Sequence, residues 1–220
     1  AMTFYSRTSG KAIYNYVHTL NYQGNPDTLI LDPLIPYRVV VHTIPTVTID
    51  SVSLAAGRHN HIGTNAARGT LEIKQPSSRL NKELDCIIRE KESRKILHVQ
   101  KLNTRQKYLV GEYDIEILTL PRYTQSISID QVRTTIIAIP PSGKVSFQAG
   151  TAGFGSIFQE IDNELIWVTD LEENQSRQSY DLQPGNFRVI FRPKSGKSTL
   201  FSISKSFSIN SGESVIVKLK

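Results

Sequence analysis

Residues 143–147, with the sequence GKVSF, decide the fold class of this chain, because the pattern that they follow occurs three times in 220 residues. A glycine begins each copy, and small or polar residues then alternate with apolar ones. This alternation is typical of a β-strand with one buried face. The earlier copies are residues 10–14 (GKAIY) and 69–73 (GTLEI). The pattern therefore predicts three strands with the same place in three similar units.

A second strand pattern, led by an aromatic residue, follows later in each unit. The aromatic residues are Tyr37, Tyr113 and Phe187. Their spacings are 76 and 74 residues, and self-similarity at a nearly fixed period indicates an array of one small fold. Arrays of this kind usually bind, space or scaffold other molecules, so the repeat indicates an architecture and not a particular ligand.

The composition is that of a folded, strand-rich protein. Hydrophobic residues make up 39% of the chain and charged residues 21%, which excludes a disordered chain, and the many Ile, Val, Thr, Ser and Tyr residues favour strands over helices. We predict an all-β protein of tandem antiparallel β-sandwich modules, with about seven strands in a full module and almost no helix. The predicted modules are residues 1–66, 67–141 and 142–220. The first is shorter, and the shortfall lies where the other two have a central hairpin.

Two segments of the third unit resemble a known family. Residues 182–189 (LQPGNFRV) and the closing residues 209–217 (INSGESVIV) are similar to the transthyretin-like (carboxypeptidase regulatory-like) β-sandwich modules of bacterial envelope proteins. In that family a Pro-Gly turn precedes an aromatic residue, and a glycine turn precedes the last strand. The second unit has Val132 where the other units have Gly57 and Gly212. The resemblance implies non-catalytic, extracytoplasmic modules, as found C-terminal to von Willebrand factor A domains, and it carries over no active site.

Two glycine-containing segments are interpreted as turns. In the turn before Phe187 we expect Pro184 to fix its own φ and Gly185 to take a positive one. Residues 193–199 (PKSGKST) imitate the end of a phosphate-binding P-loop. The first glycine of that motif would fall on Phe191, and a strand pattern follows where a P-loop requires a helix. We therefore predict a hairpin turn without nucleotide binding.

The cysteine and histidine residues do not predict catalysis. Cys86 alternates with Leu84 and Ile88 on one strand face, which indicates a buried structural thiol. His59 and His61 would point the same way on a strand and could together hold Zn²⁺ or Cu²⁺. No third ligand stands at a recognisable spacing, so we expect an exposed pair and no metal site. Paired catalytic carboxylates and a Gly-x-Ser-x-Gly elbow are both missing from the sequence, and we expect no enzyme activity and no cofactor.

The net charge of +6 and the pI of about 9.4 raise the question of anionic partners. Ten basic residues lie between Lys74 and Lys107, but four acidic residues are interleaved with them, and Tyr108 is the only aromatic residue nearby. A surface that follows phosphates would carry a cleaner charge and stacking aromatics. We predict a solvated hairpin face. Binding of an acidic glycan or of nucleic acid is the alternative, and the pattern does not favour nucleic acid.

The preferred functional interpretation is a non-catalytic spacer or interaction arm of a larger bacterial protein at the cell surface or in the periplasm. Its partners would be other domains of the same polypeptide or envelope proteins. Ala1 before Met2 resembles the remnant of a cleaved tag, so we expect the chain to be part of a longer protein. No apolar run approaches the roughly 18 residues of a transmembrane helix.

The alternative is a carbohydrate- or polyanion-binding accessory module. In this alternative Trp167, with nearby Tyr180, would form a platform for a glycan. The choice depends on the face of residues 165–169 (LIWVT) that is buried. We expect Leu165 and Trp167 to face inward, with Trp167 as a core anchor. An outward Trp167 would favour the glycan alternative.

Overall fold

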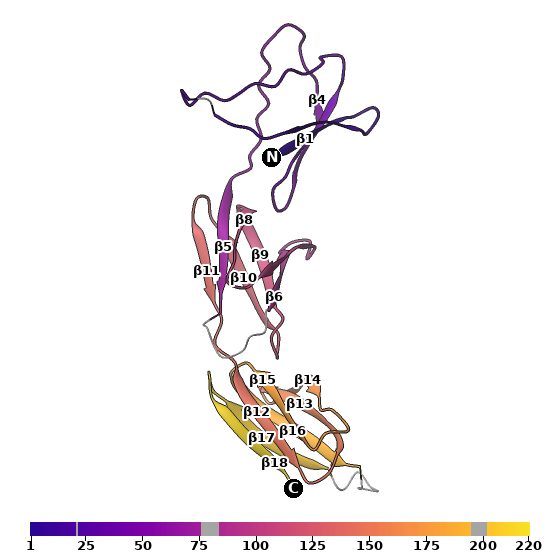
Figure 1. Ribbon diagram of the computed structural model, residues 1–220, viewed down its shortest axis with the longest axis vertical. Helices are drawn as coiled ribbons and strands as arrows, with labels where there is room; N and C mark the ends of the chain where they lie inside the picture. Colours follow the sequence, from indigo (N-terminus) through magenta and orange to yellow (C-terminus); the bar gives the residue numbers. More distant parts are fainter. Residues whose placement is uncertain (21, 76–83, 195–201) are drawn as a thin grey trace. The chain divides into compact units, whose positions relative to one another are not determined.

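The structure is a computed structural model that describes residues 1–20, 22–75, 84–194 and 202–220. The regular elements in these ranges are eighteen β-strands (Figure 1), so the predicted all-β class is confirmed. Contacts between Cα atoms group the chain into two compact units. The first is Ala1–Leu71 with Arg105–Tyr113 and Ser128–Thr135, and the second is Glu72–Thr104 with Asp114–Ile127 and Ile136–Lys220. This division runs through residues 67–141, and the three module boundaries therefore remain a prediction.

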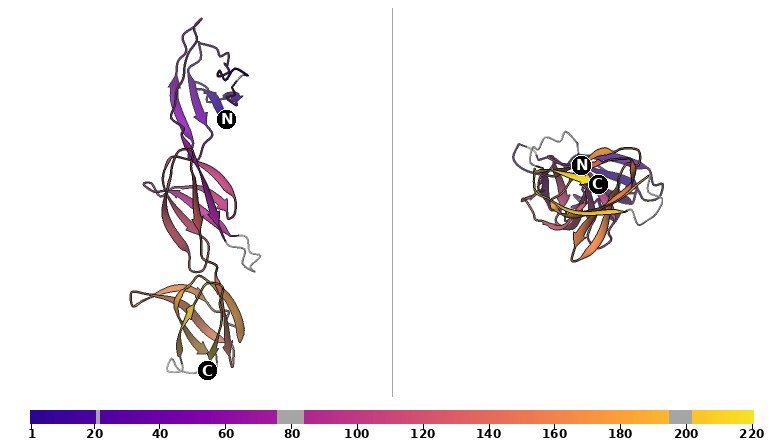
Figure 2. Two further views of the ribbon diagram at one scale, coloured as in Figure 1. Left: turned by 90° about the vertical axis from the view of Figure 1, so that its left-hand side faces the viewer. Right: turned by 90° about the horizontal axis from the view of Figure 1, so that it is seen from below.

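The first sheet has four strands in the order β2-β1-β3-β4. These strands are β1 (Met2–Ser6), β2 (Ala12–Tyr16), β3 (Tyr37–Val41) and β4 (Val47–Val52). The sheet is antiparallel, with β1 paired to both β2 and β3. Coil segments lie beside one of its faces (Figure 2). Leu29 and Leu31, between β2 and β3, and Leu54, after β4, pack against its core.

The second group of strands forms two sheets, with the orders β10-β9-β6-β7 and β11-β5-β8. The four-stranded sheet consists of β6 (Asp85–Glu90), β7 (Ile96–Lys101), β9 (Gly111–Ile117) and β10 (Tyr123–Ile129). The three-stranded sheet consists of β5 (Arg68–Lys74), β8 (Arg105–Leu109) and β11 (Thr134–Ala138).

The third group repeats this arrangement, with the orders β14-β13-β16-β17 and β15-β12-β18. Its four-stranded sheet consists of β13 (Gly153–Ile161), β14 (Glu164–Asp170), β16 (Gly185–Pro193) and β17 (Ile203–Ile209). Its three-stranded sheet consists of β12 (Gly143–Ala149), β15 (Arg177–Leu182) and β18 (Ser214–Leu219). The central strand β12 pairs antiparallel with β15 and parallel with β18. One core takes side chains from both sheets, so this group, the C-terminal sandwich, is a closed two-layer domain.

The three predicted aromatic residues hold the same place in their sheets. Tyr37, Tyr113 and Phe187 each lie at or near the start of a central strand, and each is buried. On β16 the burial alternates, with Phe187, Val189 and Phe191 inward. Because removing apolar surface from water contributes about 25 cal/mol per Å², this buried face stabilises its sheet.

Residues 10–14 are not equivalent to the glycine-led strands at 69–73 and 143–147, contrary to the prediction. Gly10 has a φ of 70° in the turn after β1, and the following residues form β2 at the edge of its sheet. Their positional counterparts are β7 and β14, whereas β5 and β12 are the central strands of three-stranded sheets. Alternation looks the same in an edge strand and in a central strand, and for this reason the sequence did not distinguish them.

The turns confirm one expectation and correct another. Equivalent turns place Gly57, Val132 and Gly212 at φ values of 65°, 59° and 72°. A strand follows the turn at Val132 and at Gly212, whereas coil follows Gly57. Val132 therefore takes the left-handed conformation that the glycines take elsewhere. Gly185, by contrast, is not among the positive-φ residues. It begins β16 and pairs with Ile209, because the strand starts directly after Pro184. Residues 195–199 of the P-loop imitation lie outside the described residues.

Candidate functional site

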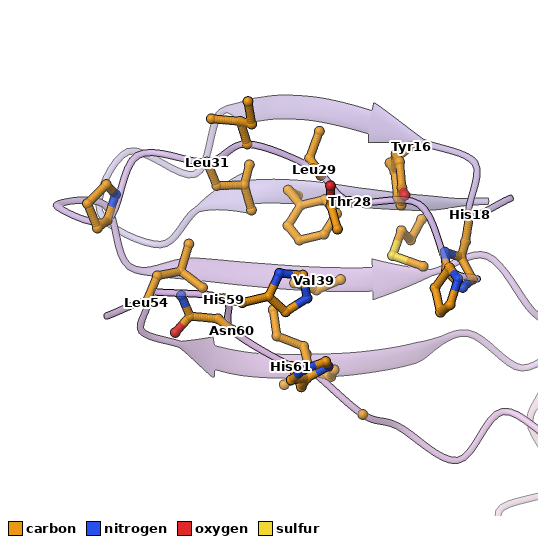
Figure 3. A pocket seen from close by; sticks show the side chains of 18 of the residues that line it. Tyr16, His18, Thr28, Leu29, Leu31, Val39, Leu54, His59, Asn60 and His61 are labelled. Atoms are coloured by element: carbon orange, nitrogen blue, oxygen red, sulfur yellow. The ribbon is translucent and has the colours of Figure 1, made fainter. Parts of the chain in front are cut away.

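A cavity of about 840 Å³ opens on one face of the first sheet (Figure 3). Its floor is the apolar face of the sheet, with Phe4 and Val39 at the centre. One wall is the segment 26–31, from which Leu29 and Leu31 point over the floor. The other wall is the segment 54–64. The cavity is therefore an apolar groove between two coil segments.

The floor of the groove is held by aromatic packing. Phe4 is buried and lies edge-on to Tyr16 and Tyr37, with ring centroids 6.4 and 6.2 Å away. Edge-to-face contacts of this kind contribute about 0.5–1.5 kcal/mol beyond the buried area. Tyr37 also donates its hydroxyl hydrogen to the carbonyl oxygen of Asp32, at 3.0 Å. These contacts fix the positions of the Phe4 and Tyr37 rings in the floor.

A polar cluster closes one end of the groove. Asp27 accepts hydrogen bonds from the backbone N–H and the hydroxyl of Thr19, at 3.0 and 2.8 Å, and its Oδ1 lies 3.0 Å from His18 Nδ1. The Tyr16 hydroxyl oxygen is buried and, among the described residues, meets no partner in regular hydrogen-bond geometry. Its interaction with the Asp27 carboxylate, followed by burial, raises the pKa of Tyr16 to about 12.

The same interaction acts on the carboxylate. The Tyr16 hydroxyl, and after it the groups of Thr19 and His18, lower the pKa of Asp27 to about 2. At neutral pH the cluster therefore consists of a charged Asp27 and a protonated Tyr16. The charged Asp27 thus holds Thr19 and His18 at this end of the groove.

His59 and His61 belong to the second wall of the groove, where both side chains are exposed. Their rings lie side by side, with centroids 4.6 Å apart. Between them, the Asn60 amide points back into the turn around Gly57 and donates to the carbonyl oxygens of Ala55 and Arg58, at 3.1 and 3.0 Å. Among the described residues no three His, Cys, Asp or Glu side chains come together as a metal site.

Trp167 is exposed, contrary to the expectation that it anchors the core. On β14 only Val168 reaches the core, and 58% of Trp167 is accessible. The pairing of β13 with β14 shifts between Ile157 and Phe158, and β14 is an edge strand. Because Val168 faces the core, its neighbour Trp167 points to the other face of the strand. Ile166 shares the face of Val168 but is also exposed in this edge strand.

Trp167 and Tyr180 meet at one residue. The Trp167 indole N–H donates to Asp170 Oδ1 at 2.9 Å, and the Ser156 hydroxyl donates to the same oxygen at 2.6 Å. These two donors, Ser156 first, hold the pKa of Asp170 below its usual value. The Tyr180 hydroxyl lies 3.1 Å from the Asp170 carbonyl oxygen, while its ring packs edge-on against Phe147. Asp170 thus orients an exposed indole beside a half-buried tyrosine.

Two further predictions concern Cys86 and the basic stretch. Cys86 is buried in the core, as predicted, and burial raises the pKa of its thiol to about 12. A thiol with this pKa is unreactive at neutral pH. Within the basic stretch, Arg89 pairs with Glu116 at 2.8 Å, and Arg122 binds the other oxygen of the same carboxylate. This pairing removes Arg89 from any free cationic surface.

The sequence indicated Trp167, Tyr180, His59 and His61 as candidate contacts, and the structure places them in two separate places. Sequence reasoning did not identify the groove residues Leu29 and Leu31, or Asn60, whose amide binds the turn around Gly57. Residues 27–31 (DTLIL) alternate like a strand, which was the available signal, but they lie outside any repeat of the glycine-led pattern.

Comparisons with known proteins give a limited result. No protein-family model matches the chain, and no curated protein matches it. The Bacillus anthracis TIE protein is similar in structure at 14% identity and a TM-score of 0.30, over 100% of this chain and 47% of that chain. The minor pilin GBS52 of Streptococcus agalactiae matches at 9% identity and a TM-score of 0.38, over 69% of this chain and 94% of that one.

A third similar structure is Dpr11 IG1 bound to DIP-gamma IG+IG2, at 16% identity and a TM-score of 0.18, over 68% of this chain and 96% of that chain. The chain spans about half the length of the Bacillus anthracis protein. At these identities and TM-scores the likenesses carry no argument about function, partners or location. No helix that could cross a membrane occurs in the part of the chain that is described.

Proposed function

We propose that the chain is a non-catalytic spacer or interaction arm built from tandem β-sandwich modules. The observation that carries this proposal is the strand order of the four-stranded sheets, which is the same three times: β2-β1-β3-β4, β7-β6-β9-β10 and β14-β13-β16-β17. Repetition of one sheet topology lengthens a chain without creating a new active site, and it is the usual basis of spacing and presenting functions.

A repeated turn supports the same proposal. After β3 and after β9 the chain forms a Thr-x-Pro turn, in which the hydroxyls of Thr43 and Thr119 donate to the carbonyl oxygens two residues later, at 2.6 and 2.7 Å. The middle residue of each turn then accepts a hydrogen bond from further along the chain. The Leu109 N–H donates to the Ile44 carbonyl oxygen at 2.8 Å, and the Gln183 N–H donates to the Leu120 carbonyl oxygen at 2.6 Å. Each bond lies within one compact unit.

The proposal includes an extracytoplasmic location in a bacterium, either the periplasm or the cell surface. It rests on the resemblance of residues 182–189 and 209–217 to transthyretin-like envelope modules. The partners would then be other domains of the same polypeptide or envelope proteins. The unreactive Cys86 thiol suits an oxidising compartment, because a buried thiol of high pKa resists oxidation.

Small-angle X-ray scattering on the purified chain tests the spacer function. A compact domain of 220 residues has a radius of gyration of about 17 Å. A spacer must hold its two ends farther apart than a single globule does, so we expect a clearly larger radius that stays unchanged in high salt. A radius at the compact value would contradict the spacer function.

A second candidate function is glycan binding, and the exposed Trp167 favours it specifically. Its indole is oriented by Asp170 and stands on an edge strand, which are the features of a stacking platform. Trp167 is also the only tryptophan of the chain, so its fluorescence reports directly on the platform. Titration with neutral and acidic hexasaccharides is expected to quench this emission if the candidate holds.

Isothermal calorimetry with the same hexasaccharides gives the control. Trp167→Ala is expected to lower the affinity about tenfold or more, since burial of a large apolar side chain contributes on the order of 1.5–3 kcal/mol. Phe154→Ala removes another exposed ring of the same sandwich and should leave binding unchanged. An unchanged emission and no heat with either class of hexasaccharide would reject the glycan function.

A further inference from the structure

The first sheet lacks the second layer that both other groups of strands have. The four-stranded sheets β10-β9-β6-β7 and β14-β13-β16-β17 are accompanied by the three-stranded sheets β11-β5-β8 and β15-β12-β18. Within residues 1–20 and 22–75, no such sheet accompanies β2-β1-β3-β4. Its apolar face is instead the floor of the 840 Å³ groove.

The two outer strands of the missing three-stranded sheet have counterparts in the first group, and both counterparts are coil. Residues 27–31 precede Tyr37 just as β8 precedes Tyr113 and β15 precedes Phe187. Residues 59–63 follow the left-handed Gly57 just as β11 follows Val132 and β18 follows Gly212. The central strand of the three-stranded sheet is β5 in the second group and β12 in the third. The described residues of the first group contain no counterpart of it. The groove lies between the two flanking segments, where that strand would be (Figure 3).

The flanking segments have the burial pattern and the unpaired backbone groups of sheet edges. Burial alternates along residues 27–31, with Leu29 and Leu31 half-buried and Ile30 89% exposed. In the described structure, the backbone N–H and C=O groups of residues 28–31 and 59–63 make no backbone hydrogen bond. Such groups are normally paired in a folded protein, and a row of them is a template for an added strand.

The Asn60 side chain occupies one of the positions that the missing strand would take. In the other two groups the residue after the starting glycine binds the turn: the Thr70 N–H donates to the Arg133 carbonyl oxygen at 2.8 Å, and the Lys144 N–H donates to the Glu213 carbonyl oxygen at 2.7 Å. Arg133 and Glu213 each follow the positive-φ residue of the turn. The counterpart in the first unit is Arg58, and its carbonyl oxygen accepts from the Asn60 amide instead.

The central strands that are present define the chemistry of the missing one. A Cβ on Gly69 would lie 2.2 Å from the Asp130 carbonyl oxygen, and one on Gly143 would lie 2.5 Å from the Ile209 side chain. Only glycine fits at this first position. The third and fifth residues of the pattern, Leu71 and Ile73 in β5 and Val145 and Phe147 in β12, are buried.

We propose that the groove is a docking site for an extended polypeptide strand of the pattern Gly-x-apolar-x-apolar, supplied from outside residues 1–220. The strand lies antiparallel to residues 27–31 and parallel to residues 59–63, as β12 lies between β15 and β18. Its glycine sits against the Gly57 turn and displaces the Asn60 amide from the Arg58 carbonyl oxygen. Its two apolar side chains cover Phe4 and Val39. This inference goes beyond the spacer function and does not depend on it.

The chain's own central strands provide the probes. A fluorescein-labelled peptide of residues 142–150 (SGKVSFQAG) or 68–75 (RGTLEIKQ) is titrated with the full chain, and binding is followed by fluorescence anisotropy. At least one of the two is expected to bind saturably and to raise the melting temperature of the first sheet. The control is the 142–150 peptide with Val145→Asp and Phe147→Asp, which is expected to bind about tenfold more weakly or worse, because it would bury two charges.

Matched variants of the chain locate the site. Leu29→Asp places a charge in the groove and is expected to weaken the peptide at least about tenfold, whereas Ile30→Asp changes the neighbouring outward residue and should leave binding as it is. Asn60→Ala removes the competing amide and should keep or increase the affinity. Circular dichroism shows whether each variant remains folded.

Several results would overturn the proposal. These are no saturable binding by either natural peptide, equal binding of the aspartate-containing peptide, or equal losses for Leu29→Asp and Ile30→Asp. Light scattering of the free chain covers a further case. A dimer that dissociates in Leu29→Asp but not in Ile30→Asp would identify the occupant as a second copy of this chain, and the assignment to an outside strand would be wrong.

Discussion

Phe187→Ala is expected to lower the free energy of unfolding of the C-terminal sandwich by about 3–5 kcal/mol, the usual cost of removing a buried phenyl ring. Phe187 is fully buried in the core that both sheets share. Its ring is stacked on Phe207, with centroids 5.6 Å apart. Truncation therefore removes apolar burial and leaves a cavity between sheets that cannot collapse easily.

Urea denaturation followed by Trp167 emission measures this loss. Trp167 lies in the same sandwich and is the only tryptophan, so its emission reports the unfolding of this sandwich alone. Ile216→Ala is the control, because Ile216 is an apolar strand residue of the same sandwich that is 62% exposed, and its loss should cost less than about 1 kcal/mol. Equal shifts of the two midpoints would contradict the assigned core.

Gly143→Ala is expected to destabilise the same sandwich by about 2–3 kcal/mol, although it adds only a methyl group. The new Cβ would lie 2.5 Å from the Ile209 side chain and 2.6 and 2.9 Å from the carbonyl oxygens of Asn210 and Glu213. Two of these three neighbours are backbone atoms of the turn around Gly212, and they cannot move without disturbing the Lys144 N–H bond to Glu213.

Gly150→Ala is the matched control in the same urea titration. Gly150 follows β12, a methyl group added to it would have no neighbouring atom within 4 Å, and its φ is not in the left-handed region. Alanine there should be neutral or stabilising by up to about 1 kcal/mol, because it restricts the unfolded chain. A Gly143→Ala midpoint as high as that of Gly150→Ala would show that the strand start is not as tightly packed as described.

Local patterns were sufficient for much of the fold. The buried places of Tyr37, Tyr113 and Phe187 follow from alternation within single strands, and the turns at Gly57 and Gly212 follow from local turn chemistry. Both signals are carried by a few neighbouring residues. The prediction that Gly185 takes a positive φ was wrong because a Pro-Gly pair is equally compatible with a strand that begins at the glycine.

The candidate sites depended on which surface covers a strand, and no local pattern states this. Alternation allowed two phases for residues 165–169, and the phase with Trp167 inward was preferred, but the structure turns Val168 to the core and Trp167 to solvent. The glycine-led residues 10–14 resembled a central strand and are an edge strand with one neighbour instead of two.

The sequence by itself therefore determined the all-β class, the repeated aromatic strands and the turns at Gly57 and Gly212, because these depend on residues close together in the chain. Only the tertiary structure decided the exposure of Trp167, the meeting of Trp167 and Tyr180 at Asp170, and the groove between residues 27–31 and 59–63. Each of these depends on long-range pairing. Exposure and cavities are set by the presence or absence of a neighbouring strand that lies far away in the sequence.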